Sequence, residues 1–257
     1  MSYALITGAS RGIGRAIAED LASRGYNVLL VARSENPLKE SAGQFREKYK
    51  IESDYLALDL TAAGAAQQIF NWCKEKKYTV SILVNNAGYG LSGPFEKYEL
   101  TEHLDMMRLN MRVPVELCKL FLPVLRSQPR SYILNIASTA AYQAVPNLSL
   151  YSATKAFILA FSRGLRQELR GSSVSVTCIS PGSTDTDFVV RAQIGEKGLK
   201  TAKKVNMTPA AVAKVAVNSM LAGKAELITG LINKLGALAV WLLPKGIVER
   251  TAMKLYE

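Results

Sequence analysis

Three residues in the middle of the chain have side chains and spacing suited to moving a proton. Tyr151 and Lys155 are four residues apart, so on a helix the phenol and the ammonium share one face. A nearby ammonium stabilises the phenolate and lowers a tyrosine pKa that is about 10 without such a neighbour. Ser138 ends a predicted strand and can hold a carbonyl oxygen by a hydrogen bond. The pair alone also fits an ordinary solvated helix face, but with Ser138 it predicts acid–base chemistry at a carbonyl or alcohol group.

A glycine-rich turn follows the first apolar run, with the spacing GxxxGxG rather than GxGxxG. Glycines between a strand and a helix let the backbone approach a pyrophosphate, and the helix N-terminus favours the anion. A turn with only a structural role is the alternative. The candidate cofactor contacts in this turn are Gly8, Ser10, Arg11, Gly12, Ile13 and Gly14.

The same turn also spells GxSxG, the pattern of a hydrolase nucleophile elbow. Such an elbow follows an internal strand of the sheet, whereas Ser10 follows the first predicted strand. The single histidine, His103, would have to be the base, and nothing in the sequence places it there. We therefore disfavour a hydrolase.

The elements that position these residues alternate between short β-branched runs and longer helical patterns. The predicted strands are Tyr3–Thr7, Asn27–Ala32, Ser53–Ala57, Ser81–Asn85, Ser131–Ile136, Val174–Ile179 and Glu226–Thr229. The predicted helices are Ile13–Arg24, Pro37–Lys48, Ala62–Lys76, Thr101–Ser127, Leu150–Arg170 and Pro209–Ala222. This alternation predicts an α/β fold: one Rossmann-like, doubly wound parallel sheet of about seven strands with helices on both faces, over residues 1–257.

With these elements in place, the sequence resembles the short-chain dehydrogenase/reductase family over about residues 3–190. The motifs that carry the resemblance are Thr7 to Gly14, Asp59-Leu60, Asn85 to Gly88, Asn110, Ser138, Tyr151 to Lys155 and Pro181 to Thr186. The resemblance implies that Tyr151 is the general acid/base, that Lys155 lowers its pKa and binds the nicotinamide ribose, and that Ser138 positions the carbonyl. It also implies that Asn110 holds a water that links Lys155 to solvent. The other implied cofactor contacts are Asp59, Leu60, Asn86, Ala87, Gly88, Pro181, Gly182, Thr184 and Thr186.

The residue that ends the second strand bears on the choice between NAD and NADP. A carboxylate there accepts from the ribose 2′-hydroxyl of NAD, whereas a cation meets the 2′-phosphate of NADP. Here Arg33 ends the strand, no acid occurs before Glu35, and Arg11 adds a second cation. A guanidinium fork suits phosphate oxygens, so the sequence favours NADP, used as NADPH. A solvated Arg33 is the alternative.

Composition excludes several other classes of protein. The three cysteines form no CxxC and there is one histidine, so neither a disulfide framework nor a metal site is expected. The net charge is +11, but no nucleic-acid motif accompanies it. The longest apolar stretch, Leu235 to Leu243, is too short to span a bilayer. The first strand begins too early to leave room for a signal peptide, so we expect a cytoplasmic protein.

These observations predict an NADPH-dependent oxidoreductase that reduces a ketone or aldehyde of a small hydrophobic substrate, with a 3-oxoacyl thioester as one candidate. An NADP-dependent alcohol or hydroxysteroid dehydrogenase working oxidatively shares every catalytic residue, and a non-catalytic NADP-sensing regulator is the alternative from another class. The mainly apolar candidate wall residues are Tyr89, Gly90, Leu91, Phe95, Tyr142, Val145, Leu148, Phe188 and Val189.

Two further expectations concern partners. The helices at 101–127 and 150–170 carry more apolar residues than one stripe needs, which predicts a homodimer or homotetramer. We expect variable, substrate-covering segments near 183–207 and 228–257. Within the latter, Ile228–Leu243 is expected to form a helix beside the substrate cleft or the subunit interface. Its basic end is a candidate for contact with a membrane surface or an acyl carrier, and a helix that only completes the fold is the alternative.

Overall fold

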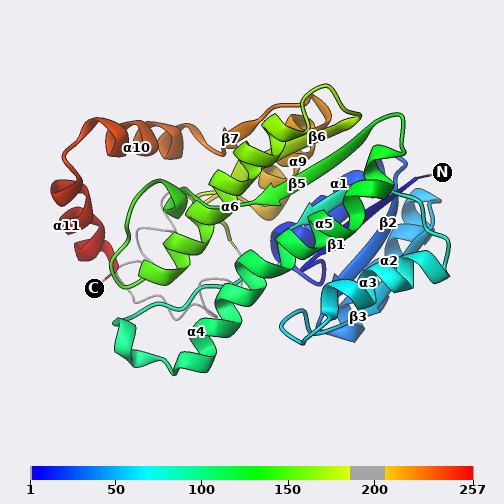
Figure 1. Ribbon diagram of the computed structural model, residues 1–257, viewed down its shortest axis with the longest axis horizontal. Coiled ribbons are helices and arrows are strands. Elements are labelled where there is room, and N and C mark those ends of the chain that lie inside the picture. Colours follow the sequence, from blue (N-terminus) through cyan, green and yellow to red (C-terminus); the bar gives the residue numbers. More distant parts are fainter. Residues whose placement is uncertain (1, 186–205, 257) are drawn as a thin grey trace.

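Seven parallel strands form the centre of the molecule in the order β3-β2-β1-β4-β5-β6-β7 (Figure 1). The structure, a computed structural model, describes residues 2–185 and 206–256. The strands are β1 Tyr3–Thr7, β2 Asn27–Ala32, β3 Ser53–Ala57, β4 Val80–Asn85, β5 Ser131–Ile136, β6 Val174–Ser180 and β7 Glu226–Ile228. The strand order reverses between β1 and β4, as in a doubly wound fold. The predicted fold class is confirmed.

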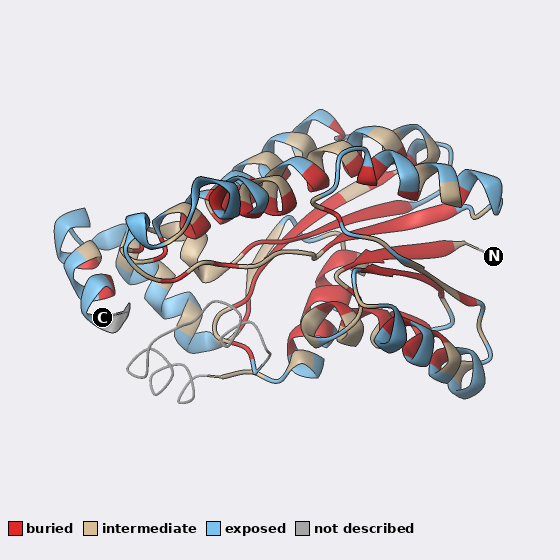
Figure 2. Cartoon of the chain, turned by 90° about the horizontal axis from the view of Figure 1, so that it is seen from below, coloured by how far each residue is buried: buried red, intermediate tan, exposed pale blue. Residues whose placement is uncertain are grey.

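Helices cover both faces of the sheet. The helices are α1 Gly12–Ser23, α2 Glu35–Tyr49, α3 Ala65–Glu75, α4 Leu100–Met107, α5 Val113–Arg126, α6 Ser149–Glu168, α9 Pro209–Leu221, α10 Leu231–Leu242 and α11 Lys245–Tyr256. One face packs against α1, α2 and α9, and the other against α3, α5 and α6. Figure 2 shows the buried strands between these two helical layers.

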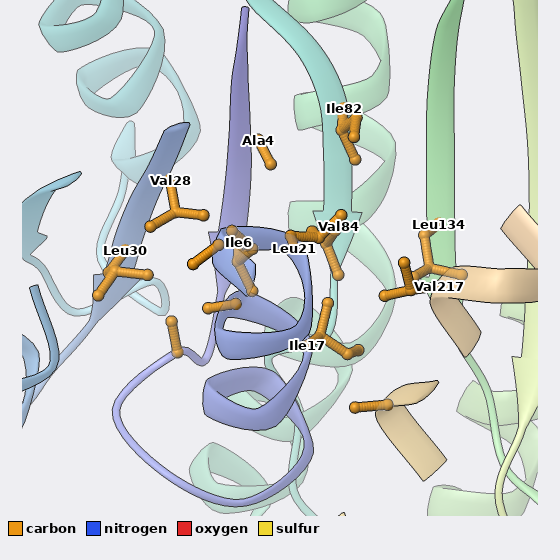
Figure 3. Packing of buried hydrophobic residues seen from close by; sticks show 14 of the residues in the cluster. Ala4, Ile6, Ile17, Leu21, Val28, Leu30, Ile82, Val84, Leu134 and Val217 are labelled. Carbon is orange, nitrogen blue, oxygen red and sulfur yellow. The ribbon is translucent and has the colours of Figure 1, made fainter. Parts of the chain in front are cut away.

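The strands are apolar on both faces because each face is covered. Ile6 and Val84 point to one face and pack against Ile17 and Leu21 of α1, as Figure 3 shows. Leu5, from the same strand as Ile6, belongs to the core on the other face. Side chains along a strand alternate between faces, so a strand covered on both sides reads as a continuous apolar run.

The predicted helix at 101–127 is interrupted. Between α4 and α5 the chain forms a π-helical turn, Arg108–Arg112, which adds a residue to the helical repeat. Single π-helical turns inside α-helices are frequent at functional sites. Here the turn contains Asn110, which is buried.

The predicted helices at 101–127 and 150–170 expose less apolar surface than their sequences suggested. On these two helices the chain itself buries apolar residues that include Met106, Val113, Leu117, Phe121 and Leu159. Phe157 of α6 stays at the surface and stacks on Phe161, with 6.1 Å between ring centroids.

Candidate active site

The predicted site residues converge at the carboxyl ends of the parallel strands. Gly8 follows β1, Asn86 follows β4, Ser138 lies just beyond β5 and Pro181 follows β6. Tyr151 and Lys155 reach this edge from the first turns of α6. In open α/β sheets the ligand site lies at this edge, where the strand order reverses.

Tyr151 and Lys155 form the buried centre of the site. The Lys155 ammonium lies 5.9 Å from the centre of the Tyr151 ring. Its Nζ donates a hydrogen bond to the carbonyl oxygen of Ile136, 2.9 Å away at the end of β5. Burial lowers the pKa of Lys155 from 10.5 to about 8, because a desolvated ammonium is disfavoured. The group is therefore poised to change protonation within the range that acid–base chemistry uses.

Ser138 holds its predicted position at the end of β5. Its hydroxyl oxygen accepts a hydrogen bond from the backbone N–H of Ala140 at 3.1 Å and caps a short 3-10 turn, Thr139–Tyr142. The backbone N–H of Thr139 donates to the carbonyl oxygen of Pro181 at 2.9 Å, which ties this turn to the end of β6. The hydroxyl of Ser138 keeps its own proton for a further acceptor, since the cap uses only its oxygen.

Asn110 reaches the site through the π-helical turn and is 1% exposed. Its Nδ2 donates to the carbonyl oxygen of Tyr89 at 2.9 Å and to Oγ1 of Thr154 at 3.0 Å, while Oδ1 accepts from the backbone N–H of Tyr89 at 3.1 Å. A Cβ at Gly88 would lie 2.9 Å from Oδ1 of Asn110 and 3.4 Å from Nζ of Lys155. Gly88 thus leaves room between these two polar groups.

The glycine-rich turn is closely packed against the end of β4. Gly8 and Gly12 adopt left-handed backbone angles, with φ of 67° and 56°, and a Cβ at Gly14 would lie only 2.3 Å from the carbonyl oxygen of Gly8. Asn86 donates from Nδ2 to the carbonyl oxygens of Thr7 and Gly8 at 2.9 and 3.2 Å. The turn and the start of α1 are therefore held in one arrangement, with backbone N–H groups available to an anion.

Three further predicted residues of the turn lie at the surface or close to it. Arg11 is exposed and precedes α1, while Ser10 and Ile13 are half-buried.

The hydroxyl of Thr7, to which we had assigned no role, accepts hydrogen bonds from the backbone N–H groups of Asn86 and Ala87 at 3.0 and 3.1 Å. The signal for Thr7 was its place directly before Gly8, and only the packing shows what its hydroxyl does.

The predicted adenosine contacts follow β2 and β3 at the same edge. Arg33 comes directly after β2 and is exposed. Asp59 is exposed, and its Oδ1 accepts from the backbone N–H and the hydroxyl of Thr61 at 2.9 and 2.8 Å. Leu60 is buried and packs in the core under α3 and α5. Glu35, the first acid after β2, accepts a long hydrogen bond of 3.5 Å from the Tyr55 hydroxyl.

The segment after β6 is only partly described. Pro181 and Thr184 are buried, and Oγ1 of Thr184 donates to the carbonyl oxygen of Gly182 at 3.2 Å. Thr186, Phe188 and Val189 lie outside the described residues. A Cβ at Gly182 would lie 2.2 Å from the Asn233 side chain, so this glycine is needed because α10 occupies the space. The sequence offered no signal for Asn233, which lies beyond the motifs.

Several of the expected substrate-wall residues gather around Tyr151. This apolar cluster, which we call the cleft cluster, consists of Met106, Val145, Leu148, Tyr151 and Ala252, with Tyr89, Leu91, Ala140 and Leu150 packed against it. Phe95 is 67% exposed instead and stacks on His103 at 4.7 Å. Tyr142 packs in a separate cluster, and its hydroxyl donates to Glu226 at 2.5 Å.

A buried polar chain beneath the site was not foreseen. Nδ2 of Asn85 donates to Oδ1 of Asn135 at 2.8 Å, and Nδ2 of Asn135 donates to the hydroxyl of Ser162 at 2.9 Å. These bonds join β4, β5 and α6 within the low-dielectric core, where a hydrogen bond is electrostatically stronger than in water. The chain therefore helps to hold α6, and with it Tyr151, against the sheet.

Two searches of the described residues complete the inventory. No helix in that part of the chain is both long and apolar enough to cross a membrane. No group of three or more histidine, cysteine, aspartate or glutamate side chains there is arranged to hold a metal ion.

The nucleotide-binding edge and the Ser138–Tyr151–Lys155 set define an oxidoreductase of the nicotinamide-dependent, Rossmann-like class. Comparison with known proteins specifies this further. The family model described as short chain dehydrogenase matches residues 2–197, and the chain belongs to the short-chain dehydrogenase/reductase family.

Individual relatives agree with this assignment. The chain is 32% identical over 221 residues to a very-long-chain 3-oxoacyl-CoA reductase of Anas platyrhynchos, covering 78% of this chain and 70% of that protein. The structure of a 7β-hydroxysteroid dehydrogenase is similar with a TM-score of 0.88 at 25% identity, covering 98% of this chain and 96% of the other. A short-chain dehydrogenase from Sphingobium yanoikuyae, solved in complex with NADPH, gives a TM-score of 0.83 at 29% identity, with 94% of each chain covered.

Proposed function

We propose that this protein uses NADPH to reduce a ketone or aldehyde group on a hydrophobic substrate, with 3-oxoacyl thioesters as the leading class. The observation that carries the proposal is the cleft cluster, which surrounds the catalytic phenol of Tyr151 with apolar side chains. A substrate whose carbonyl reaches Ser138 and Tyr151 would rest its chain against these residues. Apolar contact of this kind favours an acyl or ring system over a sugar.

The chain's own residues account for the proton. Bound NADPH supplies the hydride for the carbonyl carbon. The hydroxyl of Ser138 holds the carbonyl oxygen, and the Tyr151 hydroxyl gives that oxygen its proton. The ammonium of Lys155 stabilises the resulting phenolate, because an opposite charge nearby favours the ionised form. The phenolate of Tyr151 then regains a proton from the Lys155 ammonium, and a water beside Asn110 would return that proton to Lys155 from solvent.

The preference for NADPH rests on charge at the end of β2. Arg33 is exposed there and, among the described residues, has no carboxylate partner, while Glu35 lies in the first turn of α2. A free guanidinium at this place suits the 2′-phosphate. The glycine-rich turn, closed by Asn86, leaves backbone N–H groups for the pyrophosphate. The Sphingobium enzyme solved with NADPH supports the same cofactor.

The substrate class draws on the relatives as well as on the cleft cluster. The similarity to very-long-chain 3-oxoacyl-CoA reductases supports a long acyl substrate. A second candidate, oxidation of a hydroxysteroid or another bulky alcohol with NADP, is favoured by the similarity to the 7β-hydroxysteroid dehydrogenase over almost the whole chain. The intact Ser138, Tyr151 and Lys155 speak against a sensor that binds NADP without turnover.

We also propose a homodimer or homotetramer in the cytoplasm. Phe157 of α6 is exposed and stacks on the half-buried Phe161, and it offers apolar surface for a subunit contact. Sedimentation of the purified protein tests the assembly, and a monomer at micromolar concentration would contradict it.

The experiment that decides the function measures cofactor consumption with matched substrates. NADPH or NADH is offered with short and long 3-oxoacyl thioesters and with small ketones, and NADP with hydroxysteroids. We expect the greatest kcat/KM with NADPH and a long 3-oxoacyl thioester. Preference for a hydroxysteroid with NADP would select the second candidate, and cofactor binding without turnover on any substrate would select the sensor.

A further inference from the structure

The C-terminal helices α10 and α11 form an arm that leaves the body after β7 (Figure 1). No residue of α10 is buried. Its half-buried residues are Asn233, Ala237 and Val240, and the Asn233 side chain lies against Gly182. The large apolar side chains of α10 face solvent, whereas an ordinary surface helix turns its apolar side chains toward the core.

The outward face of α10 is a continuous apolar surface, which we call the leucine stripe. It consists of Leu231, Leu235, Leu238 and Leu242 at helical spacing, flanked by Ile232 and Trp241. Each of these six side chains is at least 52% exposed, and Trp241 is 81% exposed. Large contiguous apolar patches are rare on monomeric soluble proteins and mark interaction sites. The leucine stripe therefore has the character of an interaction surface.

Charge on the arm selects among the possible partners. From Leu231 to Lys254 the arm has four basic residues, Lys234, Lys245, Arg250 and Lys254, and one acidic residue, Glu249. All four basic side chains are exposed, whereas Glu249 is half-buried. Apolar residues with basic ones beside them match a lipid surface of negative charge, into which the apolar side chains insert while lysine and arginine remain at the headgroups. Two copies of the arm would instead repel each other.

The inward face of α11 places the arm beside the active site. Ala252 is 4% exposed and belongs to the cleft cluster with Tyr151, and Val248 is buried one turn earlier. Figure 2 shows the contrast along the arm between a few buried positions and a mostly exposed surface. A partner that covers the exposed face of the arm would thus lie close to Tyr151.

We propose that the leucine stripe and the basic side chains of α10 and α11 bind the surface of a membrane rich in anionic lipid. The arm lies in the headgroup region and does not cross the bilayer, since 12 residues of helix reach less than the thickness of the hydrocarbon core. The binding itself does not depend on the reaction. Delivery of a lipid-dissolved substrate to Tyr151 is the part that rests on the proposed function.

Flotation with lipid vesicles tests the binding without any substrate. The full-length protein is mixed with vesicles of phosphatidylcholine alone or of phosphatidylcholine with phosphatidylglycerol, at low and at high salt. We expect binding to the anionic vesicles, weakened by salt, and little binding to the neutral ones. Absence of binding to anionic vesicles, or equal binding to both kinds, would overturn the proposal.

Charge-reversal variants show whether the arm is responsible. Lys245→Glu, Arg250→Glu and Lys254→Glu combined should lower affinity for anionic vesicles by about 100-fold, since each basic residue near such a surface contributes roughly fivefold. The matched control combines Lys39→Glu, Lys74→Glu and Lys76→Glu, three exposed lysines of α2 and the end of α3, far from the arm. It changes net charge equally and should bind within a few-fold of the natural protein. Equal losses in both variants would overturn the assignment to the arm.

An apolar variant separates a membrane from a second copy of the chain. Leu235→Ser with Trp241→Ser should reduce vesicle binding at least tenfold, with an unchanged circular dichroism spectrum, because both side chains are exposed. If the variant instead turns a dimer into a monomer and still binds vesicles, a second copy covers the stripe and the proposal is wrong. Vesicle binding by a protein that reduces no carbonyl would keep this inference and reject the proposed function.

Discussion

Lys155 donates a hydrogen bond from its buried ammonium to the carbonyl oxygen of Ile136, 2.9 Å away. This bond connects α6, which carries Tyr151, to the end of β5, two residues before Ser138. The acceptor is a backbone carbonyl at the end of a strand, so the position of the ammonium relative to Tyr151 is fixed by the sheet and not by another side chain. The strand end and the helix thus bring the three polar groups of the site together.

Removal of the Tyr151 hydroxyl should abolish most turnover. Tyr151→Phe keeps the ring that packs in the cleft cluster but has no proton to give. A general acid contributes about 10²–10⁴-fold, so kcat should fall by that factor. NADPH affinity, measured by fluorescence titration, should stay within a few-fold. Turnover near that of the natural protein would remove Tyr151 from its role.

The buried charge of Lys155 should appear in the pH dependence of stability. Its folded-state pKa is about 8, below the ordinary 10.5. Between these values only the unfolded chain holds the proton, so the free energy of unfolding rises with pH. Below pH 8 both states are protonated and the cost of burying the charge is present in full.

Lys155→Met removes this titration. The difference in free energy of unfolding, variant minus natural protein, should be largest near pH 7. That difference should shrink by roughly 2 kcal/mol by pH 10. Urea denaturation at several pH values, without cofactor, measures both curves. Parallel curves would show that Lys155 has an ordinary pKa in the folded protein.

Arg33 should discriminate between the two nicotinamide cofactors. A hydrogen bond to a charged group contributes about 1.5–3 kcal/mol, so Arg33→Ala should weaken NADPH binding roughly 10- to 100-fold. NADH lacks the 2′-phosphate, and its affinity should change little. Lys39→Ala, at another exposed cation of this region, is the control. Equal losses for NADPH and NADH would exclude Arg33 as the phosphate contact.

A methyl group at Gly14 should disrupt the glycine-rich turn. Its Cβ would lie 2.3 Å from the carbonyl oxygen of Gly8 and 2.4 Å from Nδ2 of Asn86. Such overpacking typically costs about 1–3 kcal/mol, so Gly14→Ala should lower both stability and NADPH affinity. Gly43→Ala is the matched control, because the same methyl group on α2 meets no atom within 4 Å. It should leave NADPH affinity unchanged and raise stability by up to about 1 kcal/mol.

Truncation after Gly230 should change substrate preference. It removes α10 and α11 but spares β7, which ends at Ile228. Loss of Ala252 opens the cleft cluster, so kcat/KM for a long 3-oxoacyl thioester should fall at least tenfold more than for a short ketone. Circular dichroism controls for folding. Equal activity of the truncated and natural proteins on both substrates would reject a substrate-covering role.

Most of the fold and the centre of the site could be predicted because they depend on local patterns. Continuous apolar runs such as Val28 to Val31 require cover on both faces, and this requirement alone indicates a parallel sheet between helices. Tyr151 and Lys155 share a helical face through their spacing. The family model then confirmed the family that these motifs had suggested.

The details that the sequence did not predict depend on contacts between distant parts of the chain. The helical pattern at 101–127 does not reveal the π-helical turn that aims Asn110 inward, because the extra residue is stabilised by bonds to Tyr89 and Thr154. Likewise, the position of Asn233 against Gly182 depends on the path of the backbone over some fifty residues.

By itself, then, the sequence determined the order of the elements, the glycine-rich turn and the shared helical face of Tyr151 and Lys155, since each follows from spacing within a few residues. Only the tertiary structure decided how deeply Lys155 is buried, and hence the direction of its pKa shift, because desolvation depends on every element packed around the ammonium. It also decided which way α10 turns its leucines. A helix that is apolar nearly all round can present any face to the body, and here contact with Gly182 leaves the leucine stripe outside.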